Sequence, residues 1–314
     1  MDIKNVVLIG SGVLGSQIAY QVAYKGFNVT IWLRSEESIG RAKPLLARLQ
    51  GIYLTELNAA KTSKGPYSAG LLENGKEYSA EEIDLRIAKA NAALSEIKLT
   101  TDLADAVKDA DLVIEALAEN PQQKIDFYQM LAPLLPEKTI IATNSSTLLP
   151  SSLAEYTGRP EKYLALHFAN NIWRQNTAEV MGHAATDPAI YETVAKFAED
   201  IAMVPLRLKK EKDGYLLNSM LVPFLMAAQN LWAEDIADVE TIDKTWILAT
   251  GAPFGPFRIL DIVGITTAYN IIMNNPAASD PNTPYGKIAK RLKEEYIDTG
   301  KLGVNAGEGF YKYK

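Results

Sequence analysis

The chain of 314 residues is long enough for about two domains, at roughly 150 residues per domain. Its 47% hydrophobic and 22% charged residues are ordinary for globular proteins and exclude a disordered or collagen-like chain. The net charge of −6 excludes a general attraction to nucleic acid or anionic lipid, and the absence of cysteine excludes disulfides, thiolate catalysis and cysteine-ligated metals.

Two further features of the sequence bear on metal binding and on cellular location. The two histidines, His167 and His183, do not have the spacing of a chelating pair on one helical turn, so we expect no metal site. The first residues form a strand-like run and lack the basic segment, apolar segment and cleavage site of a secretory signal. We therefore expect a cytoplasmic protein.

Over residues 1–208, short runs of β-branched and apolar residues alternate with helical patterns. This alternation is typical of an α/β fold in which helices wind around a parallel sheet. The predicted strands are Asn5–Ile9, Asn28–Trp32, Ile97–Thr100, Asp111–Glu115, Thr139–Thr143, Tyr163–His167, Ala178–Met181 and Val204–Leu208.

The segment between the second and third strands, residues 35–96, is far longer than an ordinary crossover connection. We predict that it forms two helices, the first from Ser38 to about Asn58. The second helix follows Ser79, which can cap it and form a capping box with Glu82. The polar stretch 61–76 between them is predicted as their connection, because it contains Gly65, Pro66, Gly70 and Gly75.

The sheet pattern ends at Leu208, where the charged junction 209–214 precedes almost purely helical sequence. We therefore predict one domain over 1–208 and a second over 209–314. The stretch Tyr215–Ala233 contains no charged residue, but Pro223 and several amide and hydroxyl side chains interrupt its apolarity. We expect it to be a buried helix of a soluble core and no membrane span.

Residues 10–15 read Gly-Ser-Gly-Val-Leu-Gly, directly after a predicted strand and at the start of a helical run. In this context the pattern indicates a dinucleotide-binding turn. Gly10, Gly12 and Gly15 would permit the tight turn, the approach of backbone amides to a pyrophosphate and the packing of helix on strand. Val13 and Leu14 complete the predicted cofactor-binding turn.

The end of the second strand indicates which dinucleotide is bound. NAD-binding units place an Asp or Glu there, which accepts from the ribose hydroxyls. This chain has Leu33, which cannot accept, followed by Arg34 and Ser35, a charge and a hydroxyl suited to a 2′-phosphate. We favour NADP(H), with NAD(H) possible. The alternative is that Arg34 is only solvated and that Glu36 or Glu37 reaches the ribose.

Several further runs resemble the L-3-hydroxyacyl-CoA dehydrogenase family, in the same order and over nearly the whole chain. They are Val113-Ile114-Glu115-Ala116, Glu119-Asn120, Asn144-Ser145-Ser146-Thr147, His167-Phe168-Ala169-Asn170, Asn218, Leu221-Val222-Pro223, Gly255-Pro256-Phe257, Leu260-Asp261, Val263-Gly264 and Gly307-Glu308-Gly309-Phe310-Tyr311. The resemblance implies a Rossmann-like doubly wound sheet with a helical hairpin insertion over about 36–96. It further implies a smaller all-helical second domain for substrate closure and dimerisation, and so a homodimer.

The resemblance also implies an activity and the residues that carry it. The expected reaction interconverts 3-hydroxyacyl-CoA and 3-oxoacyl-CoA by hydride transfer with a nicotinamide cofactor, in fatty acid metabolism. His167 resembles the catalytic base, Glu179 the carboxylate that orients it, and Ser146 and Asn218 groups that hydrogen-bond the substrate. Positions implied near the nicotinamide ribose are Glu119, Lys124 and Asn170.

The chemistry of these residue types agrees with that assignment. Taking a hydride from a carbinol requires a base that removes its proton, and histidine is the side chain best suited to this near neutrality. The spacing of His167 and Glu179 predicts two neighbouring strands joined by a loop. A buried glutamate needs a partner, and His167 would supply one.

The chain departs from the family pattern after His167. Where the family reads His-Phe-Phe-Asn-Pro, this chain has Ala169 and Asn171, and Arg174 then adds a cation that can meet a carboxylate or a CoA phosphate. The substrate therefore stays open. The alternative is a dehydrogenase of a free 3-hydroxy acid of the carnitine or gulonate type, and a more remote one is a non-catalytic nucleotide-binding scaffold.

Overall fold

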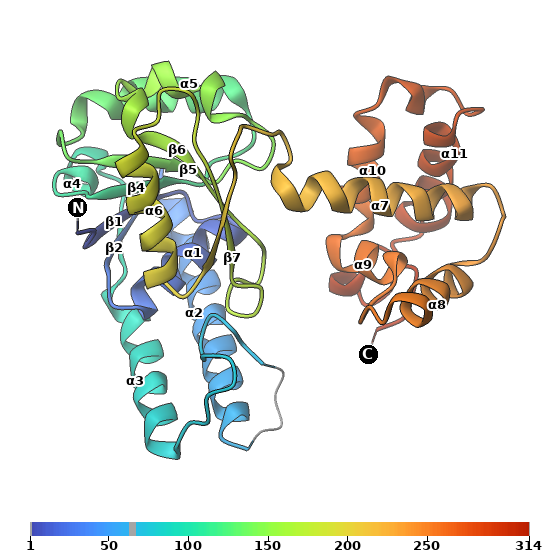
Figure 1. The fold of residues 1–314 in the computed structure, drawn as a ribbon, viewed down its shortest axis with the longest axis horizontal. Coiled ribbons are helices and arrows are strands. Elements are labelled where there is room, and N and C mark those ends of the chain that lie inside the picture. The colour runs from blue at the N-terminus through green and yellow to red at the C-terminus, as the bar shows by residue number, and fades with distance from the viewer. Residues whose placement is uncertain (1, 63–66, 314) are drawn as a thin grey trace. The chain divides into compact units, whose positions relative to one another are not determined.

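The computed structural model describes residues 2–62 and 67–313, and the chain divides into two compact units, Met1–Leu216 and Leu217–Lys314 (Figure 1). The division lies beyond the domain boundary expected near Lys209, because the junction 209–214 folds back onto the first unit. The backbone N–H of Lys212 donates to Met181 Sδ at 3.2 Å, and Tyr215 is buried in one cluster with Met181 and Leu208.

The first unit contains an eight-stranded sheet, which confirms the predicted α/β class. Its strands are β1 (Asn5–Ile9), β2 (Asn28–Trp32), β3 (Lys98–Thr100), β4 (Leu112–Glu115), β5 (Ile140–Thr143), β6 (Tyr163–Phe168), β7 (Thr177–Met181) and β8 (Val204–Arg207). They lie in the order β3-β2-β1-β4-β5-β6-β7-β8. Neighbours are parallel except β6 and β7, which are antiparallel. All eight predicted strands are present, and no end differs by more than one residue.

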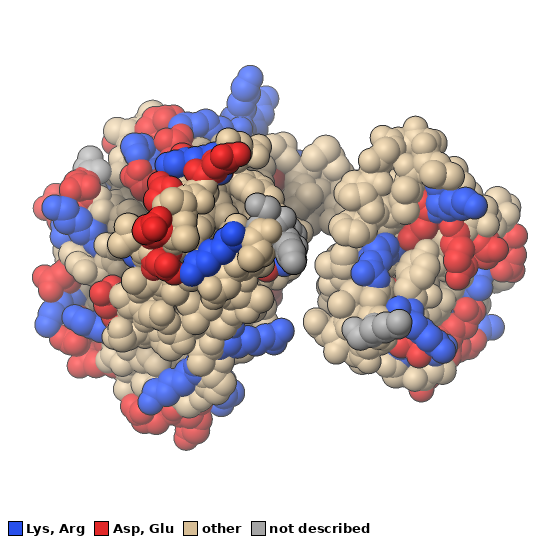
Figure 2. All heavy atoms as spheres, turned by 90° about the horizontal axis from the view of Figure 1, so that it is seen from below, with Lys and Arg blue, Asp and Glu red and all other residues tan. Residues whose placement is uncertain are grey.

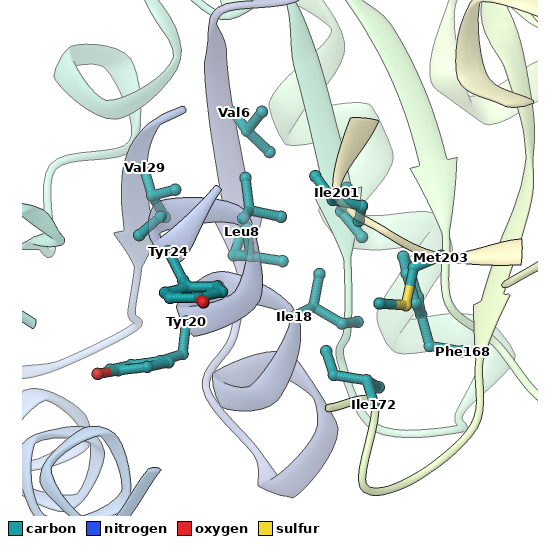
Figure 3. Packing of buried hydrophobic residues seen from close by; sticks show 14 of the residues in the cluster. Val6, Leu8, Ile18, Tyr20, Tyr24, Val29, Phe168, Ile172, Ile201 and Met203 are labelled. Carbon is teal, nitrogen blue, oxygen red and sulfur yellow. The ribbon is translucent and has the colours of Figure 1, made fainter. Parts of the chain in front are cut away.

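Helices cover both faces of the sheet because successive strand residues point to opposite sides. Val6 and Leu8 of β1 belong to the cluster that contains α1 (Val13–Tyr24) and α6 (Pro188–Asp200). Val7 and Ile9 belong to the cluster on the other face, with α4 (Leu103–Val107) and α5 (Pro121–Leu131). Figure 3 shows part of the first cluster, in which Ile18 of α1 lies between Leu8 of β1 and Phe168 at the end of β6, while Tyr20 of α1 points to the other side.

The predicted helical hairpin insertion is formed by α2 (Glu36–Ala60) and α3 (Ala80–Glu96), and it projects away from the sheet (Figure 1). The capping box at α3 is confirmed. The Glu82 N–H donates to Ser79 Oγ at 3.2 Å, and the Ser79 N–H donates to Glu82 Oε2 at 2.9 Å. Of the predicted connection, Gly65 and Pro66 lie outside the described residues.

The second unit is helical, as predicted. It contains most of α7 (Tyr215–Ala233), together with α8 (Val239–Thr250), α9 (Pro256–Val263), α10 (Ile265–Met273) and α11 (Pro284–Arg291). Its core gathers around Trp232 and Phe257, and Phe310 near the C-terminus packs on both rings.

The expected helix Tyr215–Ala233 is present, but it is buried only in part. Met220 is 67% exposed, and Leu217 and Leu231 are also exposed. An uncharged helix can be buried without cost, but the absence of charge does not show that the rest of the chain packs around every side of it. In the part of the chain that the structure describes, no helix has both the length and the apolarity that crossing a membrane requires.

Candidate active site

The turn between β1 and α1 has the geometry of a dinucleotide cradle. Gly10 has φ +93°, and a β-carbon there would lie 3.1 Å from the carbonyl oxygen of Ala116. A β-carbon on Gly15 would lie 2.7 Å from the carbonyl oxygen of Gly10. A β-carbon on Gly12 would meet nothing within 4 Å, and no side chain caps the helix that follows. The open turn and the uncapped N–H groups of α1 therefore fit a pyrophosphate.

The end of β2 carries the groups considered for the adenosine ribose. Leu33 is buried, its N–H donates to Thr100 O at 2.9 Å, and Arg34 is exposed. The Ser35 hydroxyl caps α2 by accepting from the Ser38 N–H at 3.3 Å. Its hydrogen bond to Glu37 lowers the pKa of that carboxyl below its ordinary value.

A second guanidinium, which the sequence interpretation missed, lies close to Ser35. Arg41 donates to Ser38 Oγ at 2.8 Å, and Ser38 Oγ lies 3.2 Å from Ser35 Oγ. Positions 35, 38 and 41 follow the three-residue spacing that puts side chains on one face of a helix, and this spacing was the signal available in the sequence. Two arginines and two hydroxyls therefore flank the start of α2.

His167 and Glu179 lie directly opposite each other on the antiparallel strands β6 and β7, which confirms the prediction of neighbouring strands. His167 Nδ1 lies 3.0 Å from Glu179 Oε2, and His167 Nε2 lies 3.1 Å from Ser146 Oγ. His167 and Glu179 are buried, and Ser146 is half-buried. A carboxylate can only accept, so Nδ1 carries a proton and Nε2 of the neutral ring is free to accept one. This arrangement suits a base that faces Ser146.

Glu119, one of the positions implied by the resemblance, holds the loop that carries Ser146. Its Oε1 accepts from Ser145 Oγ at 2.5 Å, and from the N–H and the hydroxyl of Thr147 at 2.8 Å each. Burial alone would raise the pKa of Glu119, but these hydrogen bonds outweigh it and hold that pKa below its ordinary value. The carboxylate therefore stays ionised and fixes both neighbours of Ser146.

Lys124, implied near the nicotinamide ribose, lies buried beside Glu115. Its side chain is 0% exposed, and Nζ lies 2.6 Å from Glu115 Oε1. Glu115 also accepts from the hydroxyls of Tyr128 at 2.9 Å and Thr143 at 2.7 Å. Lys124 therefore compensates a buried carboxylate, and Glu119, 3.7 Å from its Nζ, is the partly exposed member of this group.

The residues after β6 include Asn170, which is exposed, and Asn171, whose N–H donates to Gln17 Oε1 at 2.8 Å. Arg174, considered as a cation for a substrate anion, instead forms an ion pair with Glu56 of α2. The Glu56 side chain is largely buried. Arg174 therefore already has one carboxylate partner within the first unit, while its side chain stays 45% exposed.

Of the four residues expected at the reacting centre, the structure brings Ser146, His167 and Glu179 together. Asn218 lies in α7, is half-buried and belongs to the second unit. His183 is separate from this cluster, and its Nε2 lies 3.0 Å from the carbonyl oxygen of Pro160.

Comparison with known proteins agrees with these features. Residues 5–212 match the family model described as 3-hydroxyacyl-CoA dehydrogenase, NAD binding domain, and residues 214–313 match that of the C-terminal domain. The chain belongs to the 3-hydroxyacyl-CoA dehydrogenase family. As a member of the 3-hydroxyacyl-CoA dehydrogenase family it is an oxidoreductase that binds a nicotinamide cofactor, as predicted.

Individual relatives match over almost their whole length. The mitochondrial hydroxyacyl-coenzyme A dehydrogenase of Homo sapiens is 31% identical, over 99% of this chain and 92% of the relative. The probable 3-hydroxybutyryl-CoA dehydrogenase of Deinococcus radiodurans is 30% identical, over 98% of this chain and 99% of the relative.

Two solved structures are similar over the whole of both chains. One is a diketoreductase described in terms of substrate-directed dual catalysis of dicarbonyl compounds, with 50% identity, a TM-score of 0.85 and 100% of each chain covered. The other is the (S)-3-hydroxybutyryl-CoA dehydrogenase of Ralstonia eutropha, with 25% identity, a TM-score of 0.76 and 100% of each chain covered.

Proposed function

We propose that this enzyme interconverts 3-hydroxyacyl and 3-oxoacyl compounds by hydride transfer, with His167 as the acid and base and with NADP(H) as the preferred coenzyme. The observation that carries the proposal is the line of hydrogen-bonding groups from Glu179 through His167 to Ser146, with atom separations of 3.0 and 3.1 Å. It sits at an edge of the sheet where open α/β folds bind ligands.

The roles of the residues follow from their donors and acceptors. In the oxidation direction His167 Nε2 takes the proton of the substrate hydroxyl, and Glu179 stabilises the imidazolium that forms. Ser146 donates to the same oxygen as its negative charge develops. When bound, the nicotinamide accepts the hydride from C3 or supplies it. In the reduction direction protonated His167 donates to the developing alkoxide.

The favoured substrate class is an acyl-CoA thioester, because the curated relatives act on acyl-CoA compounds according to their names. A dicarbonyl compound without CoA is the second candidate, which the likeness to the diketoreductase favours. The ion pair of Arg174 with Glu56 weighs against a carboxylate site for a free acid at the loop 171–176. We place the working direction toward reduction, which a cellular NADPH pool would favour.

The preference for NADP(H) is supported by the end of β2. A carboxylate at the position of Leu33 would accept from the ribose, but Leu33 has no acceptor in its side chain and is buried. Arg34, Arg41 and the hydroxyls of Ser35 and Ser38 instead offer donors suited to a 2′-phosphate. Glu36 and Glu37 remain the competing choice, since they would favour NAD(H).

The deciding experiment compares initial rates with acetoacetyl-CoA, free acetoacetate and a 3,5-dioxo ester, each with NADPH and with NADH. Loss of the reduced-coenzyme absorbance reports turnover. We expect the thioester with NADPH to react fastest. Turnover of the dioxo ester alone would move the substrate to the second class. No turnover of any compound by a folded protein that binds the coenzyme would contradict the proposal.

A further inference from the structure

Tyr215, the first residue of α7, covers one face of the His167 ring. The two ring centroids lie 4.4 Å apart and the ring planes differ by 14°, so the rings are stacked. The Tyr215 hydroxyl donates to the carbonyl oxygen of Ser145 at 2.7 Å, and the side chain is buried. The Tyr215 side chain is therefore held in two ways, by the stacking of its ring face on the imidazole and by the hydrogen bond of its hydroxyl to Ser145.

The backbone at this point is shaped to achieve the contact. Tyr215 has φ +52° directly after Gly214 at φ +72°, in the left-handed region that a bulky residue rarely adopts. Such a conformation persists where the surroundings over-determine it. The next residue contributes as well, because the Leu216 N–H donates to Glu179 Oε1 at 2.8 Å. The turn 214–216 therefore contacts both His167 and Glu179.

From these contacts we infer that Tyr215 is a positioning residue for His167. It holds the imidazole plane so that Nδ1 points at Glu179 and Nε2 at Ser146, while Leu216 fixes the second oxygen of Glu179. The inference rests on the proposed function, because it takes His167 as the base. Tyr215 directly follows the junction 209–214, and neither the glycine-rich turn 10–15 nor the pattern of strands in the sequence indicates a role for it.

The contacts explain why a stacked ring matters here. The imidazole can rotate about its Cβ–Cγ bond, and the hydrogen bonds to Glu179 and Ser146 restrain this rotation only at the ring edge. A flat aromatic ring parallel to the imidazole restrains the same rotation by contact over the whole ring face, and it also stabilises the imidazolium formed during turnover. A flexible aliphatic side chain of similar size supplies neither effect.

The test uses nuclear magnetic resonance of the whole protein with labelled histidine rings, which needs no substrate. The chain has only two histidines, so the variant His183→Gln identifies the signals of His167. In the unmodified protein we expect ring-current shifts of the carbon-bound protons of His167 and nitrogen shifts of an Nδ1-protonated ring. Tyr215→Phe should keep both signatures, and Tyr215→Leu should lose the ring-current shift and show mixed tautomers.

A matched control and a kinetic readout separate positioning from general stability. Tyr191 also donates from a part-buried hydroxyl to backbone carbonyls, of Val180 at 2.9 Å and Leu208 at 3.3 Å, but does not stack on His167. Tyr191→Leu should therefore leave the His167 signals unchanged. We expect Tyr215→Leu to lower kcat by about tenfold to a hundredfold, because small errors in placement cost such factors, with little change in the coenzyme KM. Tyr215→Phe, which keeps the aromatic ring, should retain most of the kcat of the unmodified protein.

Two outcomes would overturn the inference. One is the absence of a ring-current shift at His167 in the unmodified protein, a measurement that does not depend on any variant folding. The other is a folded Tyr215→Leu variant whose His167 signals match those of the unmodified protein. If no substrate reacts but the signals change as expected, the proposed function fails and the positioning role stands.

Discussion

His167 is the residue on which the proposed chemistry depends, and replacing it by Gln keeps a polar side chain of similar reach but removes the basic nitrogen. Because general acid and base catalysis contributes about 10² to 10⁴ in rate, His167→Gln should lower kcat by that factor. Coenzyme binding, measured by fluorescence titration, should be unchanged. His183→Gln is the matched control, since that ring bonds Pro160 instead. Near-normal turnover by His167→Gln would remove the base from the mechanism.

Arg34 is the residue that we predict to determine the coenzyme preference. A charge-assisted hydrogen bond contributes about 1.5–3 kcal/mol, so Arg34→Ala should raise the NADPH KM by about tenfold or more. The NADH KM should change little, because NADH has no 2′-phosphate. Arg41→Ala should act in the same direction, and Arg48→Ala, on an exposed position of the same helix, should not. Equal changes for both coenzymes would favour Glu36 or Glu37 as the ribose ligand.

Lys124 is predicted to matter for stability. Lys124→Met removes the cation that pairs with the buried Glu115 side chain, and breaking a buried ion pair costs about 3–5 kcal/mol of the free energy of unfolding. Denaturant unfolding measures this loss. Lys108→Met, which removes an exposed pair with Asp105, should leave the unfolding midpoint nearly unchanged. A weaker coenzyme affinity of Lys124→Met without loss of stability would instead support the implied place of Lys124 beside the nicotinamide ribose.

At the scale of elements, the sequence was informative wherever the determining interactions are local. The strands follow from runs such as Val6–Ile9, and the start of α3 follows from Ser79 and Glu82, which lie within one turn of each other. His167 and Glu179 were also predictable as neighbours, since one loop joins their strands.

Contacts between distant segments could not be predicted in this way. Arg174 and Glu56 are separated by 118 positions, and nothing in either local sequence marks the other as a partner. The burial of Lys124 could not be predicted from the local sequence either, because it depends on how α5 packs on the sheet. Tyr215 is set against His167 by the fold of the junction after β8, which has no pattern of its own.

The helical insertion is joined to α1 by a buried polar contact that gives a prediction at this scale. Tyr53 of α2 donates to Gln21 Oε1 at 2.6 Å, and the Gln21 amide donates to the carbonyl oxygens of Gly70 and Ile201. Tyr53→Phe leaves a buried acceptor unsatisfied and should cost about 1–3 kcal/mol of unfolding free energy. Tyr67→Phe, which loses an exposed hydroxyl, is the control. Equal unfolding midpoints for both variants would contradict this account.

At the scale of the whole molecule, the feature to explain is the number of exposed apolar side chains in the second unit. On the face drawn in Figure 2, acidic and basic side chains are interspersed on both units, and each unit also shows areas without charge. The second unit also exposes large apolar side chains, among them Met220, Ile236 and Leu248. Single exposed apolar residues are ordinary, but many of them in one small unit make that unit a candidate for contact with another protein chain.

We propose that a second copy of the chain covers this surface, in line with the homodimer that the family resemblance implies. Light scattering should then give twice the chain mass of 34.5 kDa. Met220 and Leu248 are 67% and 73% exposed, so Met220→Glu with Leu248→Glu should leave the fold intact. Each apolar side chain buried in the dimer interface contributes roughly 1.5–3 kcal/mol to association, and burying an unpaired charge in its place costs far more. The double variant should therefore be monomeric. Leu85→Glu, at a position of α3 that is 66% exposed, should stay dimeric. A single-chain mass for the unmodified protein at micromolar concentration would contradict the dimer.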